Sequence, residues 1–146
     1  MRSRLLSATG ERTFILVFAT GDEVTEGLLS FARENDVTAG HFTAIGAFSD
    51  VTLAYFDWET KEYEQIPIEE QVELLSLVGD IALRDGQPQL HAHAVVGKRD
   101  GAAYGGHLIQ AHVRPTLEVV LSESPEHLRR RIDPHTGLAL IDVRAQ

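Results

Sequence analysis

The feature that most constrains the fold is a succession of strand-like segments that fills the chain between residues 41 and 121. Each segment is short and rich in β-branched, aromatic or alternating apolar residues, and Gly, Asp or Pro separates it from the next. The segments read HFTAIGAF, VTLAYFDW, EYEQIPI, VELLSLVGDIAL, LHAHAVVG, GGHLIQAHV and TLEVVL. Consecutive strands joined by short turns run in opposite directions, so this pattern predicts a largely antiparallel sheet. Gly46 and Gly79 fall inside strand patterns and predict bulges or close backbone contacts.

The ends of the chain add further elements. RTFILVFAT, residues 12–20, predicts another buried strand. In the following GDEVTEGLLSFAREND, apolar residues recur at helical spacing, so we expect a helix capped by Asp22 that ends near Asn35. SPEHLRRRID, residues 124–133, predicts a second helix with Ser124 as its N-cap and Pro125 and Glu126 in its first turn. LALIDV, residues 138–143, predicts a last strand.

These elements together predict one α+β domain that spans residues 1–146, with its core at about 12–143. A central, largely antiparallel sheet and about two helices are expected. The chain contains no internal repeat or low-complexity linker, and its 43% apolar and 24% charged residues are ordinary for a globular protein.

Composition also bears on function. The chain has no cysteine, which removes disulfides, thiolate metal ligands and cysteine nucleophiles. No window of about 18 apolar residues predicts a membrane span, and the N-terminus has too few apolar residues for a signal peptide, so we expect a cytoplasmic protein. The formal net charge of −9 opposes polyanions, which makes DNA a possible but disfavoured partner.

The segment LHAHAVVGKRDGAAYGGHL, residues 90–108, carries the strongest chemical signal. Its glycine at 101 suits a three-residue hairpin loop over 99–101. Counting outward from that loop places His93 opposite His107, with their Cβ atoms roughly 5 Å apart on one face, and His91 is the diagonal neighbour. The count depends on the inferred register, because a slip of one residue would send His107 to the other face. His112 falls outside this cluster.

Three converging imidazoles suit a divalent transition metal. Three histidines and a water are the ligands of an open zinc site, which makes zinc the first expectation, while nickel, iron or manganese also accept such ligands. The alternative is a polar sheet face whose histidines bond to neighbours or water. Two further residues are candidates for acid–base chemistry: Glu118, a carboxylate within the apolar run PTLEVVL, and His41, in AGHFTAIGA. Each also has a purely structural interpretation.

The order of four segments resembles a known family, the plants-and-prokaryotes-conserved (PPC) domain. These segments are FTAIGAFSDVTLAYFDWETKEY, EEQVELLSLVGDIAL, LHAHAVVGKRDGAAYGGHL and VRPTLEVVL. The resemblance implies an α+β fold around an antiparallel sheet, assembled as a homotrimer. Plant members join this domain to an AT-hook and act on AT-rich DNA, and prokaryotic members are stand-alone domains commonly labelled as predicted DNA-binding proteins. In some members the histidine segment is associated with a metal, which implicates His91, His93 and His107 here.

The chain departs from the plant pattern in two places. It contains no Arg-Gly-Arg-Pro hook, and residues 70–75 read EQVELL where the plant domain has a Gly-Arg-Phe-Glu-Ile-Leu type segment for partner contacts. Three function classes therefore stay open. The chain is a DNA-associated or regulatory domain, or a metal-dependent enzyme acting on a small molecule. In the third class the metal is structural, or the site only binds a ligand.

Overall fold

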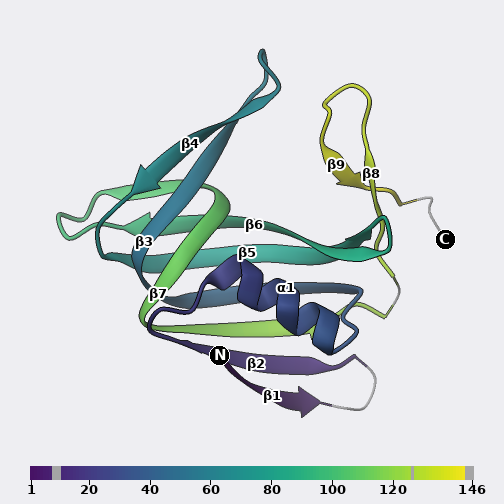
Figure 1. The fold of residues 1–146 in the computed structure, drawn as a ribbon, viewed down its shortest axis with the longest axis horizontal. Coiled ribbons are helices and arrows are strands. Elements are labelled where there is room, and N and C mark those ends of the chain that lie inside the picture. The colour runs from purple at the N-terminus through teal and green to yellow at the C-terminus, as the bar shows by residue number, and fades with distance from the viewer. Residues whose placement is uncertain (8–10, 126, 144–146) are drawn as a thin grey trace.

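The computed structural model describes residues 1–7, 11–125 and 127–143 (Figure 1). It contains one α-helix and nine strands within these residues. The elements are β1 (Arg2–Ser7), β2 (Thr13–Ala19), α1 (Val24–Glu34), β3 (Ala39–Asp57), β4 (Glu62–Ile68), β5 (Val72–Arg84), β6 (Gln87–Gly97), β7 (Ala103–Glu123), β8 (Arg130–Ile132) and β9 (Ala139–Ile141).

The main sheet has the strand order β1-β2-β7-β6-β5-β3-β4, with antiparallel pairing between neighbours. β7 also pairs with β3, so β3, β5, β6 and β7 close into a ring. In Figure 1 the long β7 bends from its pairing with β6 toward the lower strands, and β8 and β9 form a separate hairpin at one side. The predicted single domain with a largely antiparallel sheet is confirmed.

Two strands are longer than the sequence pattern indicates. β3 joins HFTAIGAF to VTLAYFDW, and β7 joins GGHLIQAHV to TLEVVL. The predicted irregularity at Gly46 is confirmed, since the pairing of β3 with β5 shifts register between Ala44 and Gly46. Pro115 is tolerated within β7 because the pairing with β3 is interrupted there. On either side of it, Val113 pairs with Phe48 and Leu117 pairs with Gly46.

The helix α1 lies across one face of the sheet and closes the core on that side (Figure 1). Its apolar stripe of Val24, Leu28, Phe31 and Ala32 is buried, and Phe31 meets Phe14 of β2 edge-on with ring centroids 5.1 Å apart. Among the described residues, no helix has the length and apolar character needed to cross a bilayer.

The start of α1 differs from the prediction by one residue. Glu23 is the N-cap, and its carboxylate accepts hydrogen bonds from the backbone N–H groups of Thr25 and Glu26. Asp22 is engaged elsewhere, because its carboxylate accepts a hydrogen bond from the backbone N–H of Ala19. The predicted end of the helix is confirmed, with Asn35 as the C-cap.

The predicted second helix is wrong over the described part of residues 124–133, and Glu126 lies outside the described residues. Arg130–Ile132 form β8, which pairs with β9 inside the predicted last strand. The backbone N–H of Leu83 in β5 donates to the carbonyl of Leu128 over 2.7 Å, and the Arg130 side chain is buried against Asp80 of β5. These contacts outweigh helical propensity, which is a weak determinant over so short a segment.

Candidate metal site

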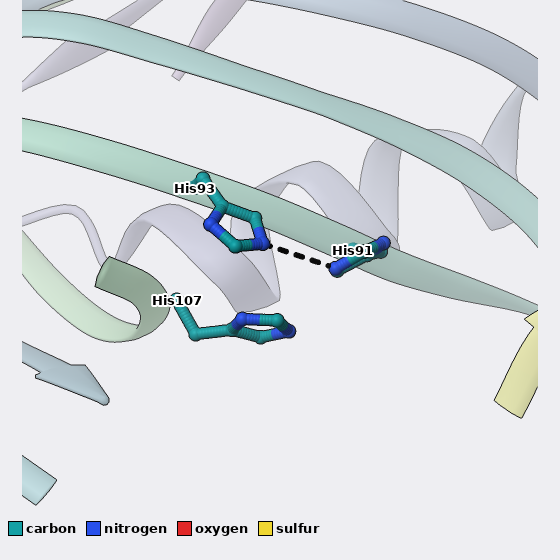
Figure 2. A group of neighbouring side chains, drawn as sticks. All are labelled: His91, His93 and His107. Carbon is teal, nitrogen blue, oxygen red and sulfur yellow. Dashed lines mark hydrogen bonds between the residues drawn. The ribbon is translucent and has the colours of Figure 1, made fainter. Parts of the chain in front are cut away.

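The three histidines of the predicted cluster come together on the hairpin of β6 and β7 (Figure 2). His93 pairs with His107, as the sequence count predicted, and the backbone N–H of Lys98 donates to the carbonyl of Ala102 across the turn. The Nε2 atoms of His91 and His93 are 3.3 Å apart, and one ligand nitrogen from each histidine lies within 4.8 Å of the others. The predicted register is therefore confirmed.

His107 occupies the point at which β7 leaves β6 for β3. It pairs with His93 on one side and with Ala54 of β3 on the other. The preceding Gly106 allows this crossing, because a Cβ there would lie 2.6 Å from the carbonyl oxygen of Ala54. The ring of His107 reaches those of His93 and His91 at centroid distances of 4.2 and 4.7 Å.

Burial favours the neutral, metal-binding form of two of these imidazoles, those of His91 and His107. Burial, followed by the positive charge of the two neighbouring histidines, lowers the pKa of His107 to about 4. Burial also lowers the pKa of His91, with a further contribution from Arg130 that Asp80 opposes. A neutral imidazole has a free lone pair on one nitrogen, so no proton has to be displaced from that atom when a metal binds.

Residues that the sequence reasoning missed surround the cluster. Tyr63 of β4 lies with its hydroxyl 3.1 Å from Nε2 of His107, and burial raises the pKa of Tyr63. Asp80 of β5 lies with Oδ2 3.8 Å from Nδ1 of His91, and Arg130 of β8 donates to Oδ1 of the same carboxylate over 2.5 Å. The carboxylate of Asp80 between the apolar residues of VELLSLVGDIAL was a usable signal. Arg130 was missed because its segment was predicted to be a helix.

A pocket of about 550 Å³ opens at the histidines. Its walls come from β5, β6 and β7, from Tyr63, and from the β8–β9 hairpin. The hairpin contributes Arg130, Ile132, Gly137, Leu138, Ala139 and Leu140. The cluster is thus partly covered by a segment more than 20 residues further along the chain, and His93 stays exposed while His91 and His107 are half-buried.

The two acid–base candidates lie apart from the histidines. The exposed His41 of β3 pairs with Asp80 of β5, and Asp80 pairs with His91 of β6. Asp80 therefore lies between His41 and His91. Glu118 is exposed and pairs with Ile45 in a different groove. The structure therefore does not bring either side chain into the pocket of the three histidines.

His112 lies outside the cluster, as predicted. Its Nδ1 is 2.7 Å from Oδ1 of Asp50, and this hydrogen bond raises the pKa of His112. The two histidines of β7 therefore differ in role: His107 faces the other imidazoles, and His112 has a carboxylate partner.

Comparison with known proteins identifies the family to which the chain is similar. The sequence profile of the Plants and Prokaryotes Conserved (PCC) domain matches residues 6–125. No curated protein sequence matches the chain.

Several solved structures share the fold. A "putative dna binding protein" from Bacteroides thetaiotaomicron is 29% identical with a TM-score of 0.90, over 98% of this chain and 99% of its own. A plant- and prokaryote-conserved protein from Pyrococcus horikoshii is 32% identical with a TM-score of 0.85, over 92% and 94%. A metal-containing protein from Archaeoglobus fulgidus is 34% identical with a TM-score of 0.84, over 97% and 98%.

The profile match includes all three histidines and Asp80, and it stops before Arg130 and the β8–β9 hairpin. The resemblance inferred from the sequence is confirmed. With most of its length matched, and with solved relatives above 30% identity over nearly the whole chain, this protein belongs to the Plants and Prokaryotes Conserved domain family.

Proposed function

We propose that this protein binds a divalent transition metal, zinc in the first instance, through His91, His93 and His107. The main support for this proposal is that one nitrogen from each of the three imidazoles lies within 4.8 Å of the other two. A tetrahedral zinc ion at about 2.0–2.1 Å from each nitrogen holds its ligands about 3.3 Å apart. The Nε2 atoms of His91 and His93 already have that separation, and a side-chain rotation of His107 completes the set.

Two further observations support the metal. The relative from Archaeoglobus fulgidus is described as metal-containing and is 34% identical to this chain. Asp80 faces Nδ1 of His91, while Nε2 of His91 faces His93. A carboxylate on the far nitrogen of a metal-binding histidine is a common arrangement that fixes the orientation of the ring.

The site favours a small-molecule ligand over a purely structural ion. Structural zinc sites are closed by four protein ligands, whereas this cluster offers three and borders a pocket of about 550 Å³. The fourth position would be left for water or a ligand, and a bound ion there would act as a Lewis acid or activate the water. The two acid–base candidates lie outside this pocket: His41 pairs with Asp80, and Glu118 lines the other groove.

Zinc uptake by the wild-type protein tests the proposal. After purification without a metal-binding tag and dialysis against chelator, we expect about one zinc per chain on reconstitution, measured by elemental analysis. At free zinc 100 times the Kd, binding adds about 2.7 kcal/mol of stability, which corresponds to a rise in Tm of roughly 5–10 °C for a chain of this size. Zinc contents well below one per chain, with no shift in Tm, would contradict the proposal.

DNA binding, the role suggested by the description of some solved relatives, receives less support. The chain has 22 acidic and 13 basic residues, and such an excess of negative charge repels phosphates. We expect no measurable binding to AT-rich duplex at 50 mM salt, where phosphate contacts are strongest, by fluorescence anisotropy at micromolar protein. Affinity that falls steeply with added salt would instead establish a local basic contact surface.

We further propose that the protein forms a homotrimer, as the family resemblance implies, through the face of the sheet away from α1. Ile45, Leu75, Val78 and Val120 line one groove there, with exposed fractions from 44% for Val120 to 63% for Ile45. A contiguous exposed apolar patch is typical of an interaction surface. Val78 pairs directly with His93, so such an interface would border the metal site.

Ile45→Glu tests this interface. Because Ile45 is 63% exposed in the single chain, the substitution costs little in the fold, but a buried charge would break the assembly. By sedimentation we expect the wild type to have a mass three times that of the 16.1 kDa chain, and the variant to have the mass of a single chain. Tyr55→Glu, at a 62% exposed position near the far end of β3, is the matched control and should stay trimeric. If the wild-type protein sediments as a monomer, the proposed homotrimer is wrong.

A further inference from the structure

The lining of the histidine pocket carries basic side chains, while their carboxylate partners, Asp80 for Arg130 and Asp85 for Arg84, lie outside the lining. Besides the histidines, its lining includes Arg84 and Arg130, and no described Asp or Glu is among the lining residues. The chain as a whole has a net charge of −9. Charges separated by more than about 8–10 Å in water are largely screened, so a ligand inside the pocket responds mainly to the groups around it, of which the guanidinium groups line the pocket and their carboxylate partners do not.

Arg130 is the most unusual member of this lining. Its side chain is 4% exposed, and it donates to Oδ1 of Asp80 and, over 2.8 Å, to the carbonyl of Ala139. These bonds use two of the five N–H donors of the guanidinium, and its Nε is buried without a hydrogen-bond partner in the described part of the chain. Oε1 of Gln89, on the same pocket wall, also has none. Both residues line the pocket, and each keeps one hydrogen-bonding atom without a partner among the described residues.

The rest of the wall is apolar. β6, β7 and the β8–β9 hairpin line the pocket with Leu90, Leu108, Ile109, Ile132, Leu138 and Leu140. A simple inorganic anion would leave this surface in water, whereas a molecule with a short hydrocarbon part would cover it. The pocket therefore combines a cationic end with an apolar side.

We propose that the pocket binds a small organic carboxylate with a short apolar chain. This inference rests on the proposed metal, since a divalent ion on the histidines would add two positive charges to those of the arginines. The carboxylate lies at the histidine end, in the field of the ion and Arg130. Its hydrocarbon part packs against the apolar residues of the hairpin.

Zinc-loaded protein titrated with 3-methylbutanoate and with its neutral counterpart, 3-methylbutanamide, tests the charge requirement. By calorimetry in a buffer that does not bind zinc, we expect the carboxylate to bind at least about tenfold more tightly, as for a charge-assisted contact. Acetate tests the apolar part and should bind at least about fivefold more weakly than 3-methylbutanoate, because it lacks the carbons that contact the apolar wall.

Substitutions of Arg130 and Arg84 test whether the preference for the carboxylate over the amide arises in this pocket. At saturating zinc, Arg130→Gln should reduce the carboxylate-to-amide affinity ratio at least fivefold, and Arg131→Gln, a neighbour on β8 outside the lining, should leave it unchanged. Arg84→Gln replaces an exposed side chain, so this variant can be tested even if the Arg130 variant does not fold. It should reduce the carboxylate-to-amide affinity ratio two- to threefold.

The outcomes separate this inference from the proposed metal. Zinc uptake at one per chain with equal binding of carboxylate and amide, or with neither bound at millimolar concentration, overturns the carboxylate inference alone. Absence of zinc uptake overturns the proposed function, and the carboxylate arrangement with it.

Discussion

Replacing His107 by alanine is expected to lower the zinc affinity of the protein by more than about 100-fold. Loss of a residue that only supports a metal ligand typically costs 10–100-fold, and loss of a ligand itself should cost more. His107 lies between the other two imidazoles and the strand β3, and its ring reaches both of theirs at under 5 Å. Without it only His91 and His93 remain, which is too few for a stable zinc site.

His112→Ala is the matched control for this substitution. Both histidines lie on β7, but His112 pairs with Asp50 and contributes nothing to the cluster. Competition against a chromophoric chelator measures both affinities, and circular dichroism checks that both variants fold. If the two substitutions reduce zinc affinity equally, or if His107→Ala retains wild-type affinity, the assignment of the ligands is wrong.

The histidine cluster was predictable because local rules determine it. A glycine at 101 sets the hairpin loop, the loop sets the register, and the two-residue period of strands then places His93 opposite His107. Each step involves residues close in sequence. The strands β5 and β6 were predictable for the same reason, since the alternation of buried and exposed residues along them is a local pattern.

The surroundings of the cluster were not predictable, because they depend on contacts between distant segments. Asp80 and Arg130 are 50 positions apart, and their ion pair is one of the distant contacts that hold a segment with helical character as a strand. Tyr63 approaches His107 because β4 extends the sheet beside β3 and β3 pairs with β7. No periodicity in a single sequence reports such pairings. The residues that shape the pocket were therefore missed, while the three histidines of the cluster were found.

Arg130→Met is expected to destabilise the fold by about 2–3 kcal/mol. Removing one partner of a buried ion pair usually costs 3–5 kcal/mol, because the other charge is left without compensation. Asp80 is 28% exposed, so water relieves part of this cost, which lowers the expected value. The lost bond to the carbonyl of Ala139 also loosens the hairpin, since that bond ties β8 to β9.

Urea unfolding of zinc-free protein measures this effect, with Arg131→Met as the control. Arg131 is the next residue of β8, is 71% exposed and pairs with Asp142, so its loss should cost below about 1 kcal/mol. Equal destabilisation by the two substitutions would mean that the buried pair with Asp80 does not hold the hairpin. A larger loss at Arg130 instead makes β8 and β9 an integral part of the fold. In that case Arg130 stabilises the hairpin and, through Asp80, the position of His91, so the part of the chain beyond the family profile takes part in building the candidate metal site.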